Sequence, residues 1–343
     1  MSQSLESIKK SLQHYLQEQM FNGNNLEIED FEQASGGWTD ETYVFTVRTE
    51  QTSEGLVIRK LKKSSLLSEE RNLTQQFKLL QILSNSTPLP VPKVFRLELD
   101  ETIIGEEFMI MERLEGKSYV PWSKEGSAFL SKASSHTHIP KQFADYLITL
   151  HMLDYKKVGI HEVFADPGEG MGFIDKKLIE LENLYLKYKN IYDPIMTDAL
   201  QWLRHHRPEA QRLSILHGDY RTGNMLYGVK AISGILDWEA AEIGDPLMDV
   251  AYICAKANRM DSPLQCYLLD RKWFLDYYAS QTGLRINEQD LHYYEVLHQV
   301  RFLLLSLSAA HAFEKENATD LRMARQGYRW TLMRNLLAET LGY

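Results

Sequence analysis

The chain has 343 residues, of which 44% are hydrophobic and 25% are charged, and its formal net charge at pH 7 is −9. These values are ordinary for a globular protein of one or two domains, and they exclude a wholly disordered chain. The acidic balance also excludes a global basic field, so we expect neither nucleic acid nor an anionic membrane as a partner.

The cysteines and the N-terminal segment indicate the compartment. Cys254 and Cys266 are the only cysteines, so a disulfide scaffold is not expected and a reducing compartment is favoured. Residues 1–16 contain no unbroken apolar stretch of the kind that signal peptides carry. The longest apolar run, residues 302–310, is about half the length of a membrane-spanning helix. We therefore expect a cytoplasmic protein and leave its oligomeric state open.

The N-terminal third is predicted to be a β-sheet with two helices. Apolar residues recur at helical spacing over residues 4–20, and a second helical pattern covers residues 69–83. Leu89–Pro92 ends the second pattern, because proline lacks an amide hydrogen and restrains the residue before it. β-branched and aromatic residues predict antiparallel strands over residues 43–47, 56–60, 94–99 and 107–111.

The rest of the chain is predicted to be mainly helical, which makes the fold class α+β with an N-terminal lobe of residues 1–112 and a C-terminal lobe of residues 113–343. Residues 117–140 are polar and predict a loop or lid with some helix. Helices are expected over residues 141–154, 173–190, 192–206, 246–260, 265–282, 288–314 and 318–341. Short strands are expected over residues 214–216, 225–227 and 234–236.

One segment between these short strands carries a pattern of catalytic residues. Asp219 lies two residues after His217 and five residues before Asn224, and Asp237 ends a short apolar run. A carboxylate in a loop can orient a hydroxyl for phosphoryl transfer, while amide and carboxylate oxygens suit Mg²⁺. The last two short strands would form a hairpin that returns Asp237 to the side of Asn224.

Each of these residues alone has an ordinary explanation, since Asp and Asn are common in turns. Their joint order, His-x-Asp-x4-Asn and then Asp, matches the catalytic core of protein kinases. His217 is expected to be structural, because Asp219 is the better placed proton acceptor. Gly218 and Gly223 are expected to allow a tight backbone.

Residues Leu216–Leu226 and Ile235–Ala251, LHGDYRTGNML and ILDWEAAEIGDPLMDVA, resemble the aminoglycoside phosphotransferase family. This family lies within the choline-kinase-like and protein-kinase-like superfamily. The resemblance extends to Ser35–Tyr43, Val57–Arg59 and Phe108–Leu114, which are similar to the family's nucleotide loop, third strand and hinge. It implies a bilobal protein-kinase-like fold, with ATP and Mg²⁺ as cofactors and a hydroxyl as acceptor of the γ-phosphate.

Transferred by position, the resemblance implies a complete set of site residues. Asp219 would be the catalytic base, with Asn224 and Asp237 as Mg²⁺ ligands. Arg59 stands where many relatives carry a phosphate-binding Lys, and Arg can also bind phosphate. The other residues expected to bind ATP are Gly36, Gly37 and Thr39 over the phosphates, Met111, Glu112 and Leu114 beside the adenine, and Leu226 beneath the ring. Asp245 and Asp249 are expected to support the loop.

One position departs from the family pattern. The helix residue expected to pair with Arg59 is Gln76, while Glu69 and Glu70 lie about two turns upstream. Because Gln cannot form an ion pair, either another group holds Arg59 or Glu69 or Glu70 turns in to pair with it. A nucleotide-binding pseudokinase that acts as a scaffold remains an alternative.

The small-molecule acceptor is also open. An aminoglycoside-like compound is one candidate, and Glu239, Glu242 and Asp261 would suit a cationic acceptor of that kind. A hydroxyacyl compound is another, because residues 277–278 and 291–296 resemble the kinase-like domain of some acyl-CoA dehydrogenase family proteins. The tyrosine pairs in those two segments could cage a cation, although packing is the more ordinary use of paired aromatics on helices.

Overall fold

The computed structural model describes residues 4–34, 40–61, 72–136, 138–165, 167–168, 172–189, 192–315 and 321–343. Contacts divide the chain into two compact units, Met1–Glu115 and Gly116–Tyr343. The division falls three residues after the lobe boundary expected from the sequence.

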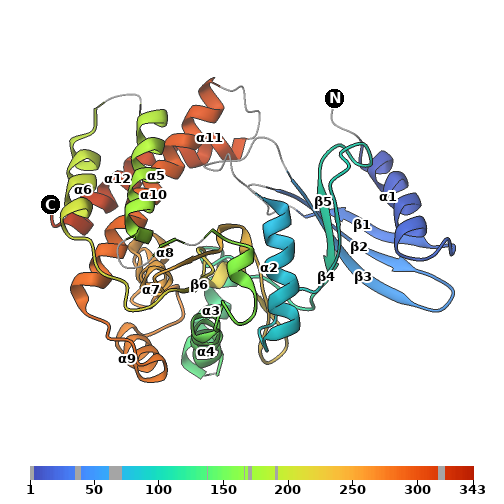
Figure 1. The fold of residues 1–343 in the computed structure, drawn as a ribbon, viewed down its shortest axis with the longest axis horizontal. Coiled ribbons are helices and arrows are strands. Elements are labelled where there is room, and N and C mark those ends of the chain that lie inside the picture. The colour runs from blue at the N-terminus through green and yellow to red at the C-terminus, as the bar shows by residue number, and fades with distance from the viewer. Residues whose placement is uncertain are drawn as a thin grey trace. The chain divides into compact units, whose positions relative to one another are not determined.

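The N-terminal unit is built on one antiparallel sheet (Figure 1). Its strands lie in the order β1-β2-β3-β5-β4, and every neighbouring pair is antiparallel. The hydrogen-bonded pairing of β2 with β3 runs without a shift from Arg48 and Ser53 to Asp40 and Leu61. The strands are β1 (Glu27–Gln33), β2 (Asp40–Arg48), β3 (Ser53–Leu61), β4 (Val94–Glu98) and β5 (Phe108–Glu112). The antiparallel sheet predicted for this lobe is therefore confirmed.

Helix α1 (Leu5–Gln19) completes the core on one face of this sheet. Its first turn is capped by Ser4, whose hydroxyl accepts from the amide of Ser7 at 3.2 Å. Helical spacing places its apolar residues on one buried stripe. The core formed with the strands contains Ile8, Leu12, Leu16, Leu26, Ile28, Phe45, Val47, Leu56, Ile58, Phe108 and Ile110.

Helix α2 (Leu73–Ser86) packs against β4 and β5. It is capped by Asn72, whose side chain accepts from the amide of Gln75 at 3.1 Å. The predicted start of this helix, at residue 69, lies outside the described residues. Within the helix, Gln76 is buried on the same face as Leu80 and Leu83.

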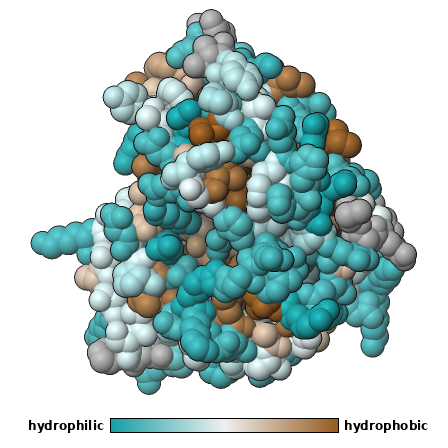
Figure 2. Space-filling model, turned by 90° about the vertical axis from the view of Figure 1, so that its left-hand side faces the viewer, coloured by the Kyte–Doolittle hydropathy of each residue, from teal (hydrophilic) through white to brown (hydrophobic). Residues whose placement is uncertain are grey.

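The C-terminal unit is organised around one long helix, α10 (Glu288–Lys315). It packs against α5 (Gly172–Tyr188), α6 (Pro194–His205), α7 (Leu247–Cys254), α11 (Leu321–Tyr328) and α12 (Trp330–Leu341). By length and composition α10 could cross a membrane, but 56% of its most apolar window is buried inside the structure. It therefore fits the role of a core helix. Viewed from the side of α6 and α12, the surface is mostly hydrophilic, with small separate hydrophobic patches (Figure 2).

Two short two-stranded sheets of the same unit hold the predicted catalytic segment. Strand β6 (Ser214–Leu216) pairs with β9 (Glu242–Gly244), and β7 (Met225–Tyr227) pairs with β8 (Ile232–Ile235). The sequence did not predict β9. The remaining described helices are α3 (Lys124–His136), α4 (Ile139–Met152), α8 (Lys256–Arg259) and α9 (Arg271–Thr282), with 3-10 turns at Ile160–Glu162, Thr222–Asn224 and Trp238–Ala240.

Several helix boundaries differ from the sequence prediction. The helix expected over residues 246–260 is interrupted at Ala255, whose ψ of 134° is extended, and forms α7 and α8. The helix expected from residue 265 begins only at Arg271, because the side chain of Asp270 caps it by accepting from the amide of Trp273 at 2.8 Å.

Two further segments also differ. In the described part of residues 318–341, Arg329 forms a turn between α11 and α12, where one helix was expected. The polar segment 117–140, expected to be a loop with some helix, consists largely of α3 and the start of α4.

We expect Leu16→Ala to lower the free energy of unfolding of the N-terminal unit by about 2–5 kcal/mol, because it removes a fully buried side chain from the α1 core. Leu5→Ala is the matched control, since Leu5 on the same helix is 44% exposed, and it should change stability by no more than about 0.5 kcal/mol. Urea unfolding followed by circular dichroism measures both. Equal effects of the two substitutions would contradict the packing of α1 on the sheet.

Candidate active site

The structure brings Asp219, Asn224 and Asp237 together at the ends of the two short sheets. The amide nitrogen of Asn224 donates to the Asp219 carboxylate at 2.6 Å and to the Asp219 carbonyl at 2.9 Å. The backbone amide of Leu236 donates to the carbonyl of Asn224 at 2.9 Å, so Asp237, the next residue, lies beside that end of the loop. The β7–β8 hairpin thus returns the chain to the loop, as the sequence indicated.

The carboxylate of Asp219 is held by two further side chains. Arg221 Nε donates to its Oδ1 at 2.9 Å, and the Tyr252 hydroxyl donates to the same oxygen. Burial would raise the pKa of Asp219, but the Arg221 charge and the hydrogen bonds from Tyr252 and Asn224 outweigh it and lower the pKa below its usual value. Asp219 is therefore ionised, and its side chain is still 26% exposed.

Arg221 and Tyr252 were not among the site residues expected from the sequence. Arg221 follows Asp219 by only two residues in the motif, so a contact between the two side chains could have been predicted from the sequence. Tyr252 lies 33 residues further along the chain, and no spacing rule predicts its contact with Asp219.

The predicted metal ligands have oxygen atoms suited to Mg²⁺. Because the amide nitrogen of Asn224 donates to Asp219, its amide oxygen is the atom left for a cation. Asp237 is exposed and adopts a left-handed backbone with φ of 64°. These two residues fit a Mg²⁺ that takes its other ligands from phosphates and water. Among the described residues, no group of three or more His, Cys, Asp or Glu could hold a metal ion.

His217 links the loop to the end of β8. Its Nδ1 accepts from the amide of Asp219 at 3.2 Å, and its Nε2 donates to the carbonyl of Leu236 at 2.9 Å. Burial lowers the pKa of His217, which agrees with the neutral ring that these two bonds require. The ring therefore has a structural use in the loop.

Asp249, in the first turn of α7, fixes the backbone of the loop. Its fully buried carboxylate accepts from the amides of His217 at 2.7 Å and Gly218 at 2.9 Å, and His151 Nε2 lies 3.2 Å away. The other ring nitrogen of His151 is 2.7 Å from the hydroxyl of Tyr278. Burial would raise the pKa of Asp249, but the His151 contacts and the His217 interactions hold it below its usual value.

Glycine is required at only one of the two glycine positions of the loop. Gly218 has φ of 77°, and a Cβ there would lie 2.2 Å from the carbonyl oxygen of Ala240. Gly223 shows no comparable backbone constraint, because a Cβ there would first meet the guanidinium end of Arg221, which can move.

Asp245 lies between β9 and α7. Its Oδ1 accepts from the amide of Leu247 at 2.9 Å, and its Oδ2 accepts from the hydroxyl of Tyr294 at 2.8 Å. Burial raises the pKa of Asp245 to about 6, because the two hydrogen bonds only partly compensate for the loss of water. The two supporting aspartates of this segment therefore have opposite pKa shifts.

In the N-terminal unit, Arg59 lies on β3 opposite Met109 of β5 and is 8% exposed. Alternation along the strand places it on the sheet face opposite that of Ile58, whose side chain joins the α1 core. The amide oxygen of Gln76 is buried and has no hydrogen-bond partner among the described residues. Gly36, Gly37, Thr39, Glu69 and Glu70 lie outside the described residues.

Of the residues expected to contact adenine, three belong to the N-terminal unit and one belongs to the C-terminal unit. Met111 and Glu112 end β5, and Leu114 follows in an irregular segment. The amide of Lys93 donates to the Glu112 carboxylate at 3.2 Å. In the C-terminal unit, Leu226 is half-buried on β7 between two buried neighbours, so its side chain points to the more open face of that hairpin.

A sequence profile of the phosphotransferase enzyme family matches residues 30–279, and the chain belongs to that family. The chain is 29% identical over 220 residues to acyl-CoA dehydrogenase family member 10 of Mus musculus, covering 64% of this chain and 19% of that protein. It is 27% identical over 228 residues to the probable acyl-CoA dehydrogenase IBR3 of Arabidopsis thaliana, covering 64% of this chain and 27% of that protein. The chain thus spans less than a third of these curated relatives.

Solved structures share the fold. A Ralstonia eutropha protein assigned to the aminoglycoside phosphotransferases matches with a TM-score of 0.73 at 21% identity, covering 96% of this chain and 97% of that one. Aminoglycoside phosphotransferase APH(4)-Ia, in a complex with AMP-PNP and hygromycin B, matches with a TM-score of 0.60 at 16% identity. The match covers 95% of this chain and 98% of that one. Plasmodium vivax ethanolamine kinase matches with a TM-score of 0.61 at 14% identity, covering 97% of this chain and 86% of that one. These likenesses confirm the predicted α+β, protein-kinase-like fold class.

The structure bears on two expectations about a cationic acceptor. Glu242 forms an ion pair with Lys177 at 2.9 Å, so its carboxylate already has a cationic partner. Three of the four paired tyrosines are packing residues, the more ordinary use expected for them: Tyr278, Tyr293 and Tyr294 are fully buried. The hydroxyl of Tyr277 donates to Asp145 at 2.6 Å.

We expect Asp245→Asn to become progressively more stabilising, relative to the wild type, as the pH rises from about 4 to about 7. The raised pKa means that the folded protein holds this proton more tightly than the unfolded chain, so ionising Asp245 opposes folding. A shift from 3.8 to about 6 corresponds to about 3 kcal/mol at most once the carboxyl is fully ionised.

Urea unfolding of both proteins at several pH values measures this difference. Well below pH 3.8 the wild-type carboxyl is protonated in both states, so the pH-dependent part of the difference should vanish. A stability difference that stays constant across the range would contradict the raised pKa.

Proposed function

We propose that the chain is an ATP- and Mg²⁺-dependent small-molecule kinase that transfers the γ-phosphate to a hydroxyl of its acceptor. The observation that carries this proposal is the ionised carboxylate of Asp219, which Arg221, Tyr252 and Asn224 hold in one orientation. Membership of the phosphotransferase enzyme family supports the reaction class, and the AMP-PNP bound to APH(4)-Ia supports a nucleotide as donor.

In the proposed mechanism, Asp219 accepts a hydrogen bond from the hydroxyl group of the acceptor. This bond aligns the hydroxyl oxygen with the phosphorus atom of the γ-phosphate. The lowered pKa makes Asp219 a weak base, so its main contribution is orientation, with proton transfer late in the reaction. Asn224 and Asp237 would hold Mg²⁺, which neutralises charge on the phosphates. Arg221 and Tyr252 are positioning residues that fix the carboxylate.

We assign the nucleotide contacts to the residues that the family pattern indicates. Arg59 would bind phosphate, and Gly36, Gly37 and Thr39 would cover the phosphate chain. The backbone at Met111, Glu112 and Leu114 would meet the adenine, with Leu226 beneath the ring. A fixed and permanently charged guanidinium can bind two phosphate oxygens at once, which supports Arg59 in place of a lysine.

A pseudokinase is the second candidate, and Gln76 is the observation that favours it. A neutral amide cannot form the ion pair that holds the phosphate-binding residue in protein kinases. Its amide oxygen is instead buried without a partner among the described residues. Such a protein would bind nucleotide without turnover, so ATP consumption in the presence of hydroxyl compounds separates the two proposals.

We expect Asp219→Asn to lower the rate of ATP consumption with any accepted hydroxyl compound by at least about 100-fold. The amide keeps the shape of the side chain but removes the charge that orients the hydroxyl. Far-ultraviolet circular dichroism and a Mg·ATP titration are the controls, and both should match the wild type. A variant that turns over at the wild-type rate would remove Asp219 from the catalytic role.

We expect Asp237→Ala to weaken the binding of Mg·ATP at least about tenfold, which equals about 1.4 kcal/mol. The reason is the loss of a carboxylate ligand to the metal. Asp261→Ala is the matched control, because Asp261 is an exposed aspartate of the same unit, and it should leave the affinity unchanged. Isothermal titration calorimetry measures both variants, and equal affinities would count against the metal assignment.

A further inference from the structure

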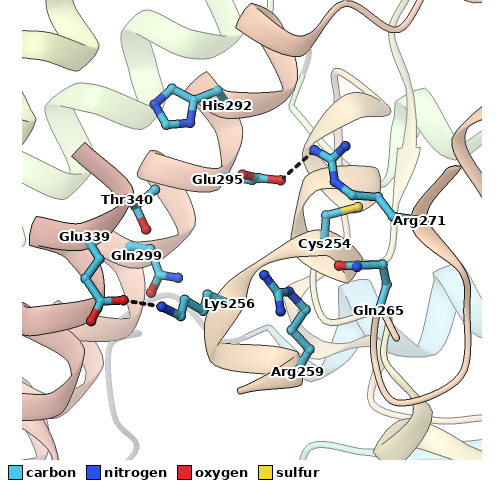
Figure 3. A pocket seen from close by; sticks show the side chains of 10 residues that line it. All are labelled: Cys254, Lys256, Arg259, Gln265, Arg271, His292, Glu295, Gln299, Glu339 and Thr340. Atoms are coloured by element: carbon cyan, nitrogen blue, oxygen red, sulfur yellow. Dashed lines mark hydrogen bonds and ion pairs between the residues drawn. The ribbon is translucent and has the colours of Figure 1, made fainter. Parts of the chain in front are cut away.

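A polar cavity of about 260 Å³ lies in the C-terminal unit, between the end of α7, α8, α10 and α12, close to the start of α9 (Figure 3). Nine of its ten lining residues carry polar or charged side chains, and the tenth is Cys254. Burial raises the pKa of the Cys254 thiol, so this group is neutral. The cavity is therefore unsuited to an apolar ligand and suited to one that forms many hydrogen bonds.

Three cations line the cavity, and two of them are already neutralised. Lys256 bonds to the carboxylate of Glu339, and Arg271 bonds to Glu295 at 3.4 Å and to Glu288 at 3.0 Å (Figure 3). These pairs leave little excess charge at that side of the cavity.

Arg259, at the end of α8, is the third cation. Its Nη1 donates only to backbone carbonyls, at 3.1 Å to Ser262 and at 3.5 Å to Met260. Its Nε is buried and has no hydrogen-bond partner, and no ion pair of Arg259 occurs in the described part of the chain. A guanidinium without a carboxylate in contact can form charge-assisted hydrogen bonds with a bound anion.

Two buried amides in the lining also lack partners. Gln299, which is 1% exposed on α10, has neither its amide oxygen nor its amide nitrogen hydrogen-bonded in the described structure. Gln265, which is 3% exposed, has an amide oxygen without a partner there. A buried polar group left unpaired destabilises the folded protein. A polar ligand in the cavity would satisfy these groups, with the Gln299 nitrogen as a further donor to an anion.

The lining is connected to the catalytic loop by short contacts within the same unit. The carbonyl of Cys266, next to Gln265, accepts from the hydroxyl of Thr222 at 3.0 Å. Asn258, next to Arg259, donates to the carbonyl of Tyr252 at 2.8 Å. Tyr252 in turn holds the carboxylate of Asp219, so the cavity wall and the catalytic carboxylate share a support.

We propose that this cavity binds an anionic group, a carboxylate or a phosphate, of the phosphoryl acceptor, with Arg259 as its cation and the amide nitrogen of Gln299 as a hydrogen-bond donor to the anion. Hydroxyl groups of the same molecule would donate to the unpaired amide oxygens of Gln265 and Gln299. The inference rests on the proposed kinase function for the identity of the molecule that carries the anion. It predicts that the acceptor is an acidic hydroxyl compound and that a cationic acceptor is excluded.

Calorimetric titration of inorganic phosphate and of succinate into the full chain, with Mg·ADP present in excess, tests the anion site. We expect one of the two probes to bind, and the probe that binds identifies the phosphate or the carboxylate as the recognised group. Arg259→Gln should weaken that binding at least tenfold. Lys272→Gln is the control, because Lys272 is an exposed cation on α9 outside the cavity, and it should bind the probe like the wild type. Binding of neither probe, or equal binding by Arg259→Gln and the wild type, would overturn the proposal.

Kinetics with the hydroxyl compounds that support ATP consumption test the assignment to the acceptor. Arg259→Gln should raise the KM for an acidic acceptor at least tenfold while kcat and the KM for ATP change less than threefold. Preferred turnover of neutral or cationic acceptors, unaffected by this substitution, would refute that assignment. If no hydroxyl compound supports ATP consumption, the kinase proposal fails by itself, while the Arg259-dependent titration still decides whether the anion site exists.

Discussion

The catalytic segment depends on the two hydrogen bonds that the buried carboxylate of Asp249 accepts from the amides of His217 and Gly218. Hydrogen bonds to an ionised group in a low-dielectric interior are strong and directional. They join the loop to the first turn of α7, while His151 and Tyr278 extend the same network to α4 and α9. The direction of Asp219 is thus set by a rigid interior network.

Asp219, Asp245 and Asp249 show how partners decide the charge of a carboxylate in this region. Asp219 has a guanidinium beside it, and Asp249 has a histidine and backbone amides, so the pKa of each is lowered despite burial. Asp245 has one amide and one phenol and no cation, so burial prevails and its pKa rises to about 6. The residue proposed to meet the acceptor is thus one whose pKa is lowered.

The sequence predicted those features that depend on local pattern. Residues Asp219, Asn224 and Asp237 could be placed together because a short hairpin connects them, whereas the support that Asp249 gives the loop was expected only from the resemblance to the family. The features it missed depend on contacts between distant segments. Strand β9 is three residues long and exists through its pairing with β6. The contact of Tyr252 with Asp219 depends on how α7 packs, which no spacing rule encodes.

The long helix α10 shows how one element can support both the catalytic loop and the cavity. Tyr294 donates to Asp245, and His298, one turn later, donates to the carbonyl of Met248 at 2.7 Å, so one edge of the helix holds α7. Glu295 and Gln299, each one residue further, line the cavity. Because residues four apart share a helix face, the two functions occupy adjacent stripes. A ligand that binds Glu295 or Gln299 would therefore contact the same helix that positions α7. Helix α7 in turn carries Asp249, which holds the loop. An acceptor anion bound at Arg259 would therefore contact the helices that hold the catalytic loop, although the chain as a whole carries a net charge of −9.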